Sequence, residues 1–248
     1  MKKNIIFLII SVLLFPIENI SQQKQTEKIN TNKFRQLNQE FASPNMFRTA
    51  SGAPGPAYYQ QQADYIINIE LDDANKKIYG DEIVTYTNNS PDLLDYLWVQ
   101  LDQNVRSKDS PSLIRDSNSV NPAYIPDTFE KEFINDPFDG GFNIEYVRDI
   151  NDKPLDYFVN QTMMRIDLPK AIGTGESFSF KVKWWYNIND HVNDGGRSGY
   201  ETFPNDDNRA YIIAQFFPRM CVYDEVEGWQ NYQFWGDGEF ALPFGNYE

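Results

Sequence analysis

The strongest constraint on the fold is a long alternation of apolar and polar side chains between Ser177 and Ile188, interrupted only at Trp185. Six large apolar residues fall on one side of an extended chain there: Phe178, Phe180, Val182, Trp184, Tyr186 and Ile188. Serines and lysines hold the other side, joined by Trp185 and Asn187. Successive side chains of a strand point to opposite faces, so the segment predicts a strand with one buried face.

Shorter stretches repeat this pattern along the chain. Residues 65–71 alternate, a turn-like stretch follows, and 78–87 completes a predicted hairpin. Further strands are expected at 97–101, 142–147, 164–168, 211–217, 229–235 and 239–244. Helical spacing is confined to 31–41 and one turn near 129–134. The predicted fold class is therefore mostly β, an antiparallel β-sandwich or saddle with little helix.

The amino end has the three parts of an export signal. Lys2 and Lys3 precede an apolar run, Ile5–Phe15, and the small residue Ser21 stands before Gln22. The run is too short to cross a bilayer, which disfavours a transmembrane anchor. We expect a signal peptide over 1–21, a polar segment over 22–63 and a β-domain over 64–248. The mature protein would be secreted or periplasmic, with no membrane span, and an export signal without disulfides suggests a bacterium.

Composition removes several kinds of chemistry. The 248 residues include one histidine and one cysteine, and 36 acidic residues outnumber 22 basic ones. One cysteine permits no intrachain disulfide and no cysteine-cluster metal site, and one histidine permits no two-histidine zinc site. The excess of acidic residues disfavours nucleic acid as a partner, because phosphate binding depends on lysine and arginine.

Two features could bind a metal ion. His191 lies in a polar loop beside Asp190 and Asp194, where it is either a ligand or general base, or a solvated loop histidine. Solvation is favoured, since no second imidazole or thiolate completes a usual zinc shell. The loops at 135–141 and 193–196 carry Asp and Gly that could bind calcium, but their spacing is more typical of turns.

Two further features could serve an enzyme or a binding module. Adjacent carboxylates occur at 81–82, 206–207 and 224–225, and their separation in space decides whether any pair could act as acid and nucleophile. Four tryptophans could stack on sugar rings or lie in the core: Trp184, Trp185, Trp229 and Trp235.

Two stretches together resemble a known family. The predicted hairpin leads into Leu94–Asn104, and Ala214–Trp229 reads A-Q-F-F-P-R-M-C-V-Y-D-E-V-E-G-W far downstream. This is similar to the amino-terminal β-domain of the aminopeptidase N and leukotriene hydrolase family of zinc metallopeptidases, in its exported bacterial branch. The resemblance covers roughly 63–248.

The resemblance implies a saddle of antiparallel strands packed against a separate thermolysin-like catalytic domain. In that family a glutamine of this domain holds the α-amino group of a peptide, and the matching position is Gln215. Phe217 stands where the family places an acidic residue. The family's zinc motif, H-E-x-x-H, is absent from these 248 residues, so the resemblance implies a fragment that stops before the catalytic domain, with a β-domain incomplete at its C-terminal end.

The sequence thus predicts a non-catalytic domain of a secreted, zinc-dependent aminopeptidase. It would form one wall of the substrate cleft and help to orient the peptide N-terminus. It would hold no metal and no catalytic residue itself, zinc and hydrolysis would belong to the full-length parent, and it would be inactive alone. The alternative is a secreted β-sandwich module that binds glycans or peptides.

Overall fold

The computed structural model describes residues 44–112, 123, 125–126, 129–130, 134, 138–205, 208–238 and 240–248. All of them fall within one compact unit, Ala42–Glu248. The predicted signal peptide and the predicted helix at 31–41 lie outside these residues, as does most of the helical turn near 129–134. No helix among the described residues is long and apolar enough to cross a membrane.

The first sheet has four antiparallel strands in the order β1-β2-β7-β4. They are β1 (Gln62–Asp72), β2 (Lys77–Thr87), β7 (Ser177–Asn187) and β4 (Asn143–Asp149). The predicted hairpin is confirmed, because β1 pairs with β2 over the full length of both strands. The alternation in β7 is also confirmed: Phe180, Val182, Trp184 and Tyr186 are buried.

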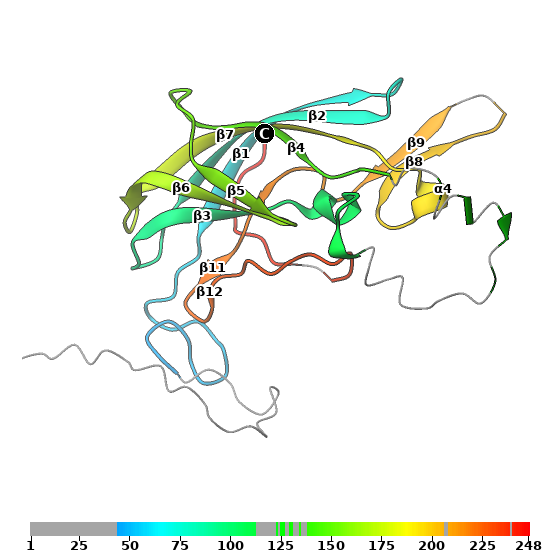
Figure 1. Cartoon of the computed structure of the whole chain (residues 1–248). Coiled ribbons are helices and arrows are strands. Elements are labelled where there is room, and N and C mark those ends of the chain that lie inside the picture. The colour runs from blue at the N-terminus through cyan, green and yellow to red at the C-terminus, as the bar shows by residue number, and fades with distance from the viewer. Residues whose placement is uncertain are drawn as a thin grey trace, which may run out of the picture. The chain divides into compact units, whose positions relative to one another are not determined.

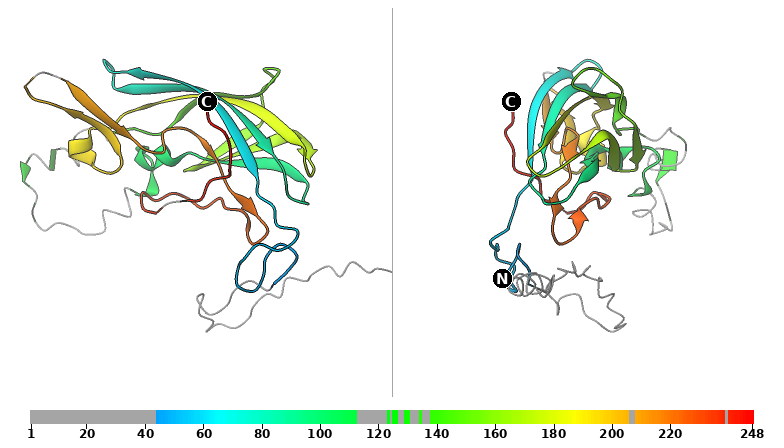
Figure 2. Two further views of the ribbon diagram at one scale, coloured as in Figure 1. Left: turned by 180° about the vertical axis from the view of Figure 1, so that it is seen from behind. Right: turned by 90° about the vertical axis from the view of Figure 1, so that its left-hand side faces the viewer.

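The second sheet has the order β10-β3-β6-β5 and lies against the first (Figures 1 and 2). Its strands are β10 (Arg219–Met220), β3 (Leu94–Gln100), β6 (Met163–Ile172) and β5 (Tyr157–Asn160). Apolar side chains of both sheets form one core cluster, which includes Leu97 and Ile166 of the second sheet and Trp184 of the first. The predicted class, mostly antiparallel β with little helix, is confirmed.

A glycine allows the largest side chain of the core to fit. Gly80 on β2 is paired with Trp184 on β7, and the indole ring lies over it. A Cβ at Gly80 would be only 2.1 Å from ring atom Cζ2 of Trp184. Only glycine leaves this space without movement of the ring.

Smaller elements extend from the two sheets. The 3-10 helix η2 (Asp102–Arg106) follows β3, and the short helix α4 (His191–Asp194) follows β7. Two separate hairpins follow: β8 (Ser198–Thr202) with β9 (Arg209–Ile213), and β11 (Tyr223–Asp224) with β12 (Gly228–Trp229).

Residues 244–248 run parallel to β1 along its free edge. The amides of Ala63, Tyr65 and Ile67 donate to the carbonyls of Phe244, Asn246 and Glu248. Gly245 lies so close to β1 that a Cβ would be 1.6 Å from the carbonyl oxygen of Ala63. The ring of Tyr247 stacks on that of Tyr65, with centroids 4.9 Å apart.

Some predicted strand limits are wrong near the carboxyl end. The described residues of the strands expected at 229–235 and 239–244 are irregular except for Trp229 and Phe244. Strand β9 ends at Ile213 instead of continuing to Phe217. Rings pack singly in these stretches, as Phe234 does edge-on against Phe240. Apolar content there reflects isolated aromatic contacts and not ladder pairing.

Candidate functional site

Gln215 lies in the connection between β9 and β10, on a backbone of left-handed conformation. Its φ is 55°, which is uncommon for a residue with a Cβ and is held only where surrounding contacts fix it. The side chain of Gln103, on η2, supplies those contacts. Its Nε2 donates to the carbonyl oxygen of Ala214 at 2.9 Å and to that of Gln215 at 3.2 Å.

A buried ion pair fixes the same segment at its other end. Arg219 Nε donates to Asp102 Oδ2 at 3.0 Å, and Arg219 Nη2 donates to that atom and to Gln100 Oε1. Asp102 is 1% exposed, and burial raises its pKa against the opposing attraction of Arg219. Because Asp102 and Gln103 are adjacent, η2 holds the chain on both sides of Gln215.

The two residues after Arg219, Met220 and Cys221, are buried in the core. The amide of Met220 donates to the Tyr65 hydroxyl at 2.9 Å, and Cys221 is fully buried. Burial raises the pKa of the Cys221 thiol, so the thiolate needed for nucleophilic attack is disfavoured. Phe217 packs edge-on against Tyr65 with centroids 5.5 Å apart. The position where the resembled family has an acidic residue therefore serves aromatic packing.

The Gln215 side chain itself is half-buried. Its amide makes no hydrogen bond to any residue that the structure describes. An amide has both donors and an acceptor, so a side chain in this state can bind a polar group of a ligand.

His191 lies on α4, on a different loop from Gln215 and from Cys221. It is half-buried, and its Nδ1 is a buried atom without a hydrogen-bond partner in the described part of the chain. Neighbouring Asn189 Oδ1 and Ser198 Oγ share that state. The loop at 135–141 is outside the described residues at 135–137.

The described residues bring together no set of zinc ligands. No three His, Cys, Asp or Glu side chains among the described residues are placed to share a metal ion. The single imidazole and the single thiol lie on separate elements, and the thiol is enclosed in the core.

The two carboxylate pairs that the structure describes do not act as pairs. Asp81 accepts a hydrogen bond from the Tyr146 hydroxyl at 3.0 Å on the outer face of the first sheet, whereas Glu82 points into the core. Asp224 binds Gln230, and Glu225 pairs with Arg48. The pair at 206–207 lies outside the described residues.

The tryptophans are divided between core and surface. Trp184 is fully buried, so of its two alternatives the core position is confirmed. Trp229 is half-buried between Tyr86 and Tyr223. Trp185 is half-buried beneath Lys77, whose Nζ is 4.3 Å from the ring centroid, and Trp235 is 39% exposed.

Two supporting residues, Asp102 and Gln103, were not singled out from the sequence. The change from mainly apolar to mainly polar residues at Gln100 marks the end of β3 in the sequence. It does not reveal which residues Asp102 and Gln103 contact. The partner lies more than a hundred residues later: Gln103 and Ala214 are separated by 111 positions.

Comparison with known proteins finds likeness only among solved structures. No protein-family model and no curated protein matches the chain. The structural neighbours include an M1 zinc metallopeptidase from Deinococcus radiodurans, at 10% identity and a TM-score of 0.30 over 52% of this chain and 20% of that one. A mutant of that enzyme bound to a Tyr-Ser-Ala substrate aligns at 11% identity and a TM-score of 0.31 over 57% and 23%.

A two-domain M1 zinc metallopeptidase mutant bound to L-arginine aligns at 10% identity and a TM-score of 0.32. The alignment covers 68% of this chain and 27% of that structure. The chain thus spans about a quarter or less of the solved structures that it is similar to.

Proposed function

We propose that this protein is a non-catalytic β-domain of a secreted zinc-metallopeptidase-like protein, and that Gln215 binds the α-amino group of a peptide. The zinc ion and the residues that activate water would belong to a thermolysin-like catalytic domain. The proposal rests on residues of this chain: the Ala214–Trp229 stretch that carries the resemblance, and the state in which the structure holds Gln215.

The observation that supports the proposal best is the contrast between the backbone of Gln215, which buried groups fix, and its side-chain amide. Gln103 and the Asp102–Arg219 pair fix a left-handed backbone at Gln215, while the Gln215 amide makes no hydrogen bond to the described residues. A strained backbone that is held by buried polar groups and carries an unused amide is typical of a ligand contact. Gln61 shows the structural case: its Nε2 donates a hydrogen bond to Asn88 Oδ1, and its Oε1 accepts one from the backbone amide of Asn89.

Nuclear magnetic resonance titration of the ¹⁵N-labelled chain tests the proposal. Alanyl-alanine amide, with a free amino group, should shift the Gln215 side-chain amide and the backbone amides of 214–219. The N-acetylated peptide should leave them in place. Gln215→Ala should remove the response, and Gln62→Ala, a half-buried glutamine on β1, should retain it. Equal shifts with both peptides would refute the role of the amino group.

Export is proposed on the signal-like residues 1–21. Amino-terminal sequencing of protein recovered outside the cytoplasm should start at Gln22. Recovery of the chain in the cytoplasm with Met1 retained would contradict export.

A further inference from the structure

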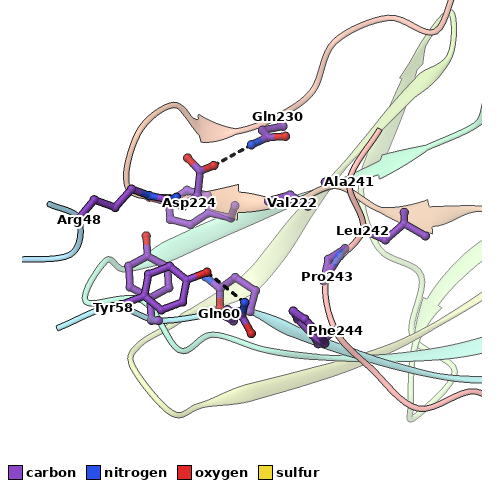
Figure 3. A pocket seen from close by; sticks show the side chains of 13 residues that line it. Arg48, Tyr58, Gln60, Val222, Asp224, Gln230, Ala241, Leu242, Pro243 and Phe244 are labelled. Atoms are coloured by element: carbon purple, nitrogen blue, oxygen red, sulfur yellow. Dashed lines mark hydrogen bonds between the residues drawn. The ribbon is translucent and has the colours of Figure 1, made fainter. Parts of the chain in front are cut away.

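A cavity beside the β11–β12 hairpin is separate from the Gln215 segment, because no residue of 214–219 lines it. Its volume is about 380 Å³, within the range of small-ligand sites. Figure 3 shows the three stretches that meet there: Arg48 with residues 58–61, residues 222–230 around the hairpin, and residues 241–244. The cavity is therefore a candidate for a second binding site.

Aromatic side chains form much of the wall, and their positions are fixed by contacts outside it. Four of them line the cavity: Tyr58, Tyr59, Tyr223 and Phe244. The Tyr223 hydroxyl donates to Asp92 Oδ2 at 2.8 Å. The carbonyl oxygen of Phe244 accepts from the amide of Ala63 at 2.7 Å. A ligand therefore meets a wall that is already formed, and less ordering entropy is lost on binding.

Phe244 presents an apolar surface at the rim of the cavity. It is 66% exposed, and no aromatic ring in the described part of the chain packs against it. Leu242, the next lining residue but one, is also exposed. A ligand with an apolar face would cover the Phe244 ring, and the removal of apolar surface from water is favourable.

Two glutamines of the wall each have a free carbonyl oxygen. Gln230 Nε2 donates to Asp224 Oδ2 at 2.7 Å, and Gln60 Nε2 donates to the Tyr58 hydroxyl at 3.0 Å (Figure 3). Neither Oε1 atom has a hydrogen-bond partner among the described residues. Gln60 is exposed, and Gln230 is half-buried with its Oε1 outside the set of buried polar atoms that lack a partner. Both oxygens are therefore acceptors that solvent, and a ligand, can reach.

Arg48 supplies donors on the same wall. Its Nε pairs with Glu225 Oε1, and its guanidinium lies over the Tyr58 ring at 5.5 Å from the centroid. These two contacts fix the plane of the guanidinium. Its Nη1 and Nη2 make no hydrogen bond to the residues that the structure describes, and they are not buried atoms. The outer edge of the guanidinium therefore remains able to donate to a ligand oxygen.

The charges at the cavity favour a neutral ligand. Arg48 and Asp224 are the charged residues that line it, and +1 and −1 cancel. An ammonium group would be repelled by the guanidinium, and an anion by Asp224 and by Glu225 behind Arg48. A hydroxyl group both donates and accepts hydrogen bonds, so it suits glutamine oxygens and arginine donors together. A sugar ring combines several hydroxyl groups with an apolar face for the exposed Phe244 ring.

We propose that this cavity binds pyranose rings of a neutral glycan, or the corresponding free sugar. Sugar hydroxyls donate to Oε1 of Gln60 and Gln230 and accept from the Nη atoms of Arg48, and the apolar face of a ring packs against Phe244. None of the four tryptophans considered for sugar stacking lines the cavity. The site does not involve Gln215, so it stands apart from the proposed function.

Nuclear magnetic resonance titration of the full ¹⁵N-labelled chain tests this assignment. The probes are cellotriose, mannotriose, galactotriose and N-acetylchitotriose, with the methyl glycoside of each single unit. At least one triose should shift the amides of 58–60, 222–230 and 241–244 saturably and leave those of 214–219 in place. Equal affinity for its methyl glycoside would identify a free sugar as the source, and tighter binding of the triose a glycan chain. Sorbitol, which has hydroxyl groups but no ring, should bind at least about tenfold more weakly. No shift with any of these sugars, equal binding of sorbitol, or the same shifts with N-acetyl-alanyl-alanine amide would overturn the proposal.

Variants locate the site and separate it from Gln215. Phe244→Ala removes the exposed ring and should weaken sugar binding at least about fivefold, with at least about threefold for Gln60→Ala. Hydrogen exchange of the Ala63 amide checks that residues 244–248 still pair with β1 in Phe244→Ala. The matched controls Phe203→Ala, at a ring that is 45% exposed, and Gln161→Ala, at an exposed glutamine, should bind as the wild type does. Gln215→Ala should also leave the affinity unchanged. Full affinity in both Phe244→Ala and Gln60→Ala would refute this location even if a sugar binds.

Discussion

Replacing Glu82 by glutamine should remove a pH dependence of stability that this carboxyl group imposes on the protein. Glu82 lies on β2 between Ile67 and Val182 of the neighbouring strands, and it is 0% exposed. Neither carboxylate oxygen has a hydrogen-bond partner in the described part of the chain. Burial, and the charge of Asp81, raise its pKa well above the ordinary value. Ionisation in the folded state is therefore unfavourable.

The direction and size of the effect follow from proton linkage. Above the ordinary pKa the unfolded chain has released this proton, while the folded chain still holds it up to the raised pKa. Unfolding then releases a proton, so stability is greatest below the ordinary pKa and falls as the pH rises. The loss is about 1.4 kcal/mol for each pH unit in that interval.

Urea unfolding at pH 5.5 and 6.5 measures this loss of stability. The free energy of unfolding of Glu82→Gln, minus that of the wild type, should increase by about 1.4 kcal/mol between these two pH values. The same difference for Glu201→Gln, an exposed residue on β8, should not change. The amide leaves an unsatisfied polar group, as the neutral carboxyl group does, so the two proteins should be about equally stable below the ordinary pKa, where Glu82 is protonated in both states. A difference for Glu82→Gln that is equal at both pH values would refute the reasoning.

Three other substitutions test the packing. Arg219→Met leaves the buried carboxylate of Asp102 unpaired and should destabilise the protein by about 3–5 kcal/mol in urea unfolding; a loss below about 1 kcal/mol would show that the ion pair is unimportant. Gly245→Ala places a Cβ where the carbonyl of Ala63 lies, and it should release residues 244–248 and speed hydrogen exchange of the Ala63 amide; unchanged exchange would contradict that contact. Gly80→Ala forces the facing indole ring to move and should cost about 1–3 kcal/mol in thermal unfolding, and an unchanged melting temperature would mean that the ring has room.

The long strands could be predicted from the sequence because their burial follows their periodicity. β2 alternates between buried and half-buried residues along its whole length, and so does most of β7. β5 was missed because all four of its residues are exposed, which leaves no pattern of burial in the sequence. β8 was missed for a related reason: it is short, and its second residue is the glycine Gly199, which weakens a strand signal.

The supports of the candidate site could not be predicted from local pattern. Gln215 is found through the resemblance, but its left-handed backbone depends on Gln103, which is 112 positions away. A cavity that Tyr59 and Phe244 line together is likewise made of segments that meet only in the folded chain. In the sequence Asp81 and Glu82 form one adjacent pair of carboxylates, and the alternation of β2 places Glu82 in the core.

The parallel segment at 244–248 also has a consequence for the order of folding. Its side-chain contact from Asn246 to Asp64 spans 182 positions, whereas the β1–β2 hairpin closes over a turn of four residues, Asp73–Lys76. Closing a long loop costs more chain entropy than closing a short one, so this segment joins β1 after the hairpin has formed. During synthesis on the ribosome, β1 and β2 emerge long before residue 244. The free edge of β1 is then open to other strands until residues 244–248 arrive, and chaperones that bind extended chain would act in that interval.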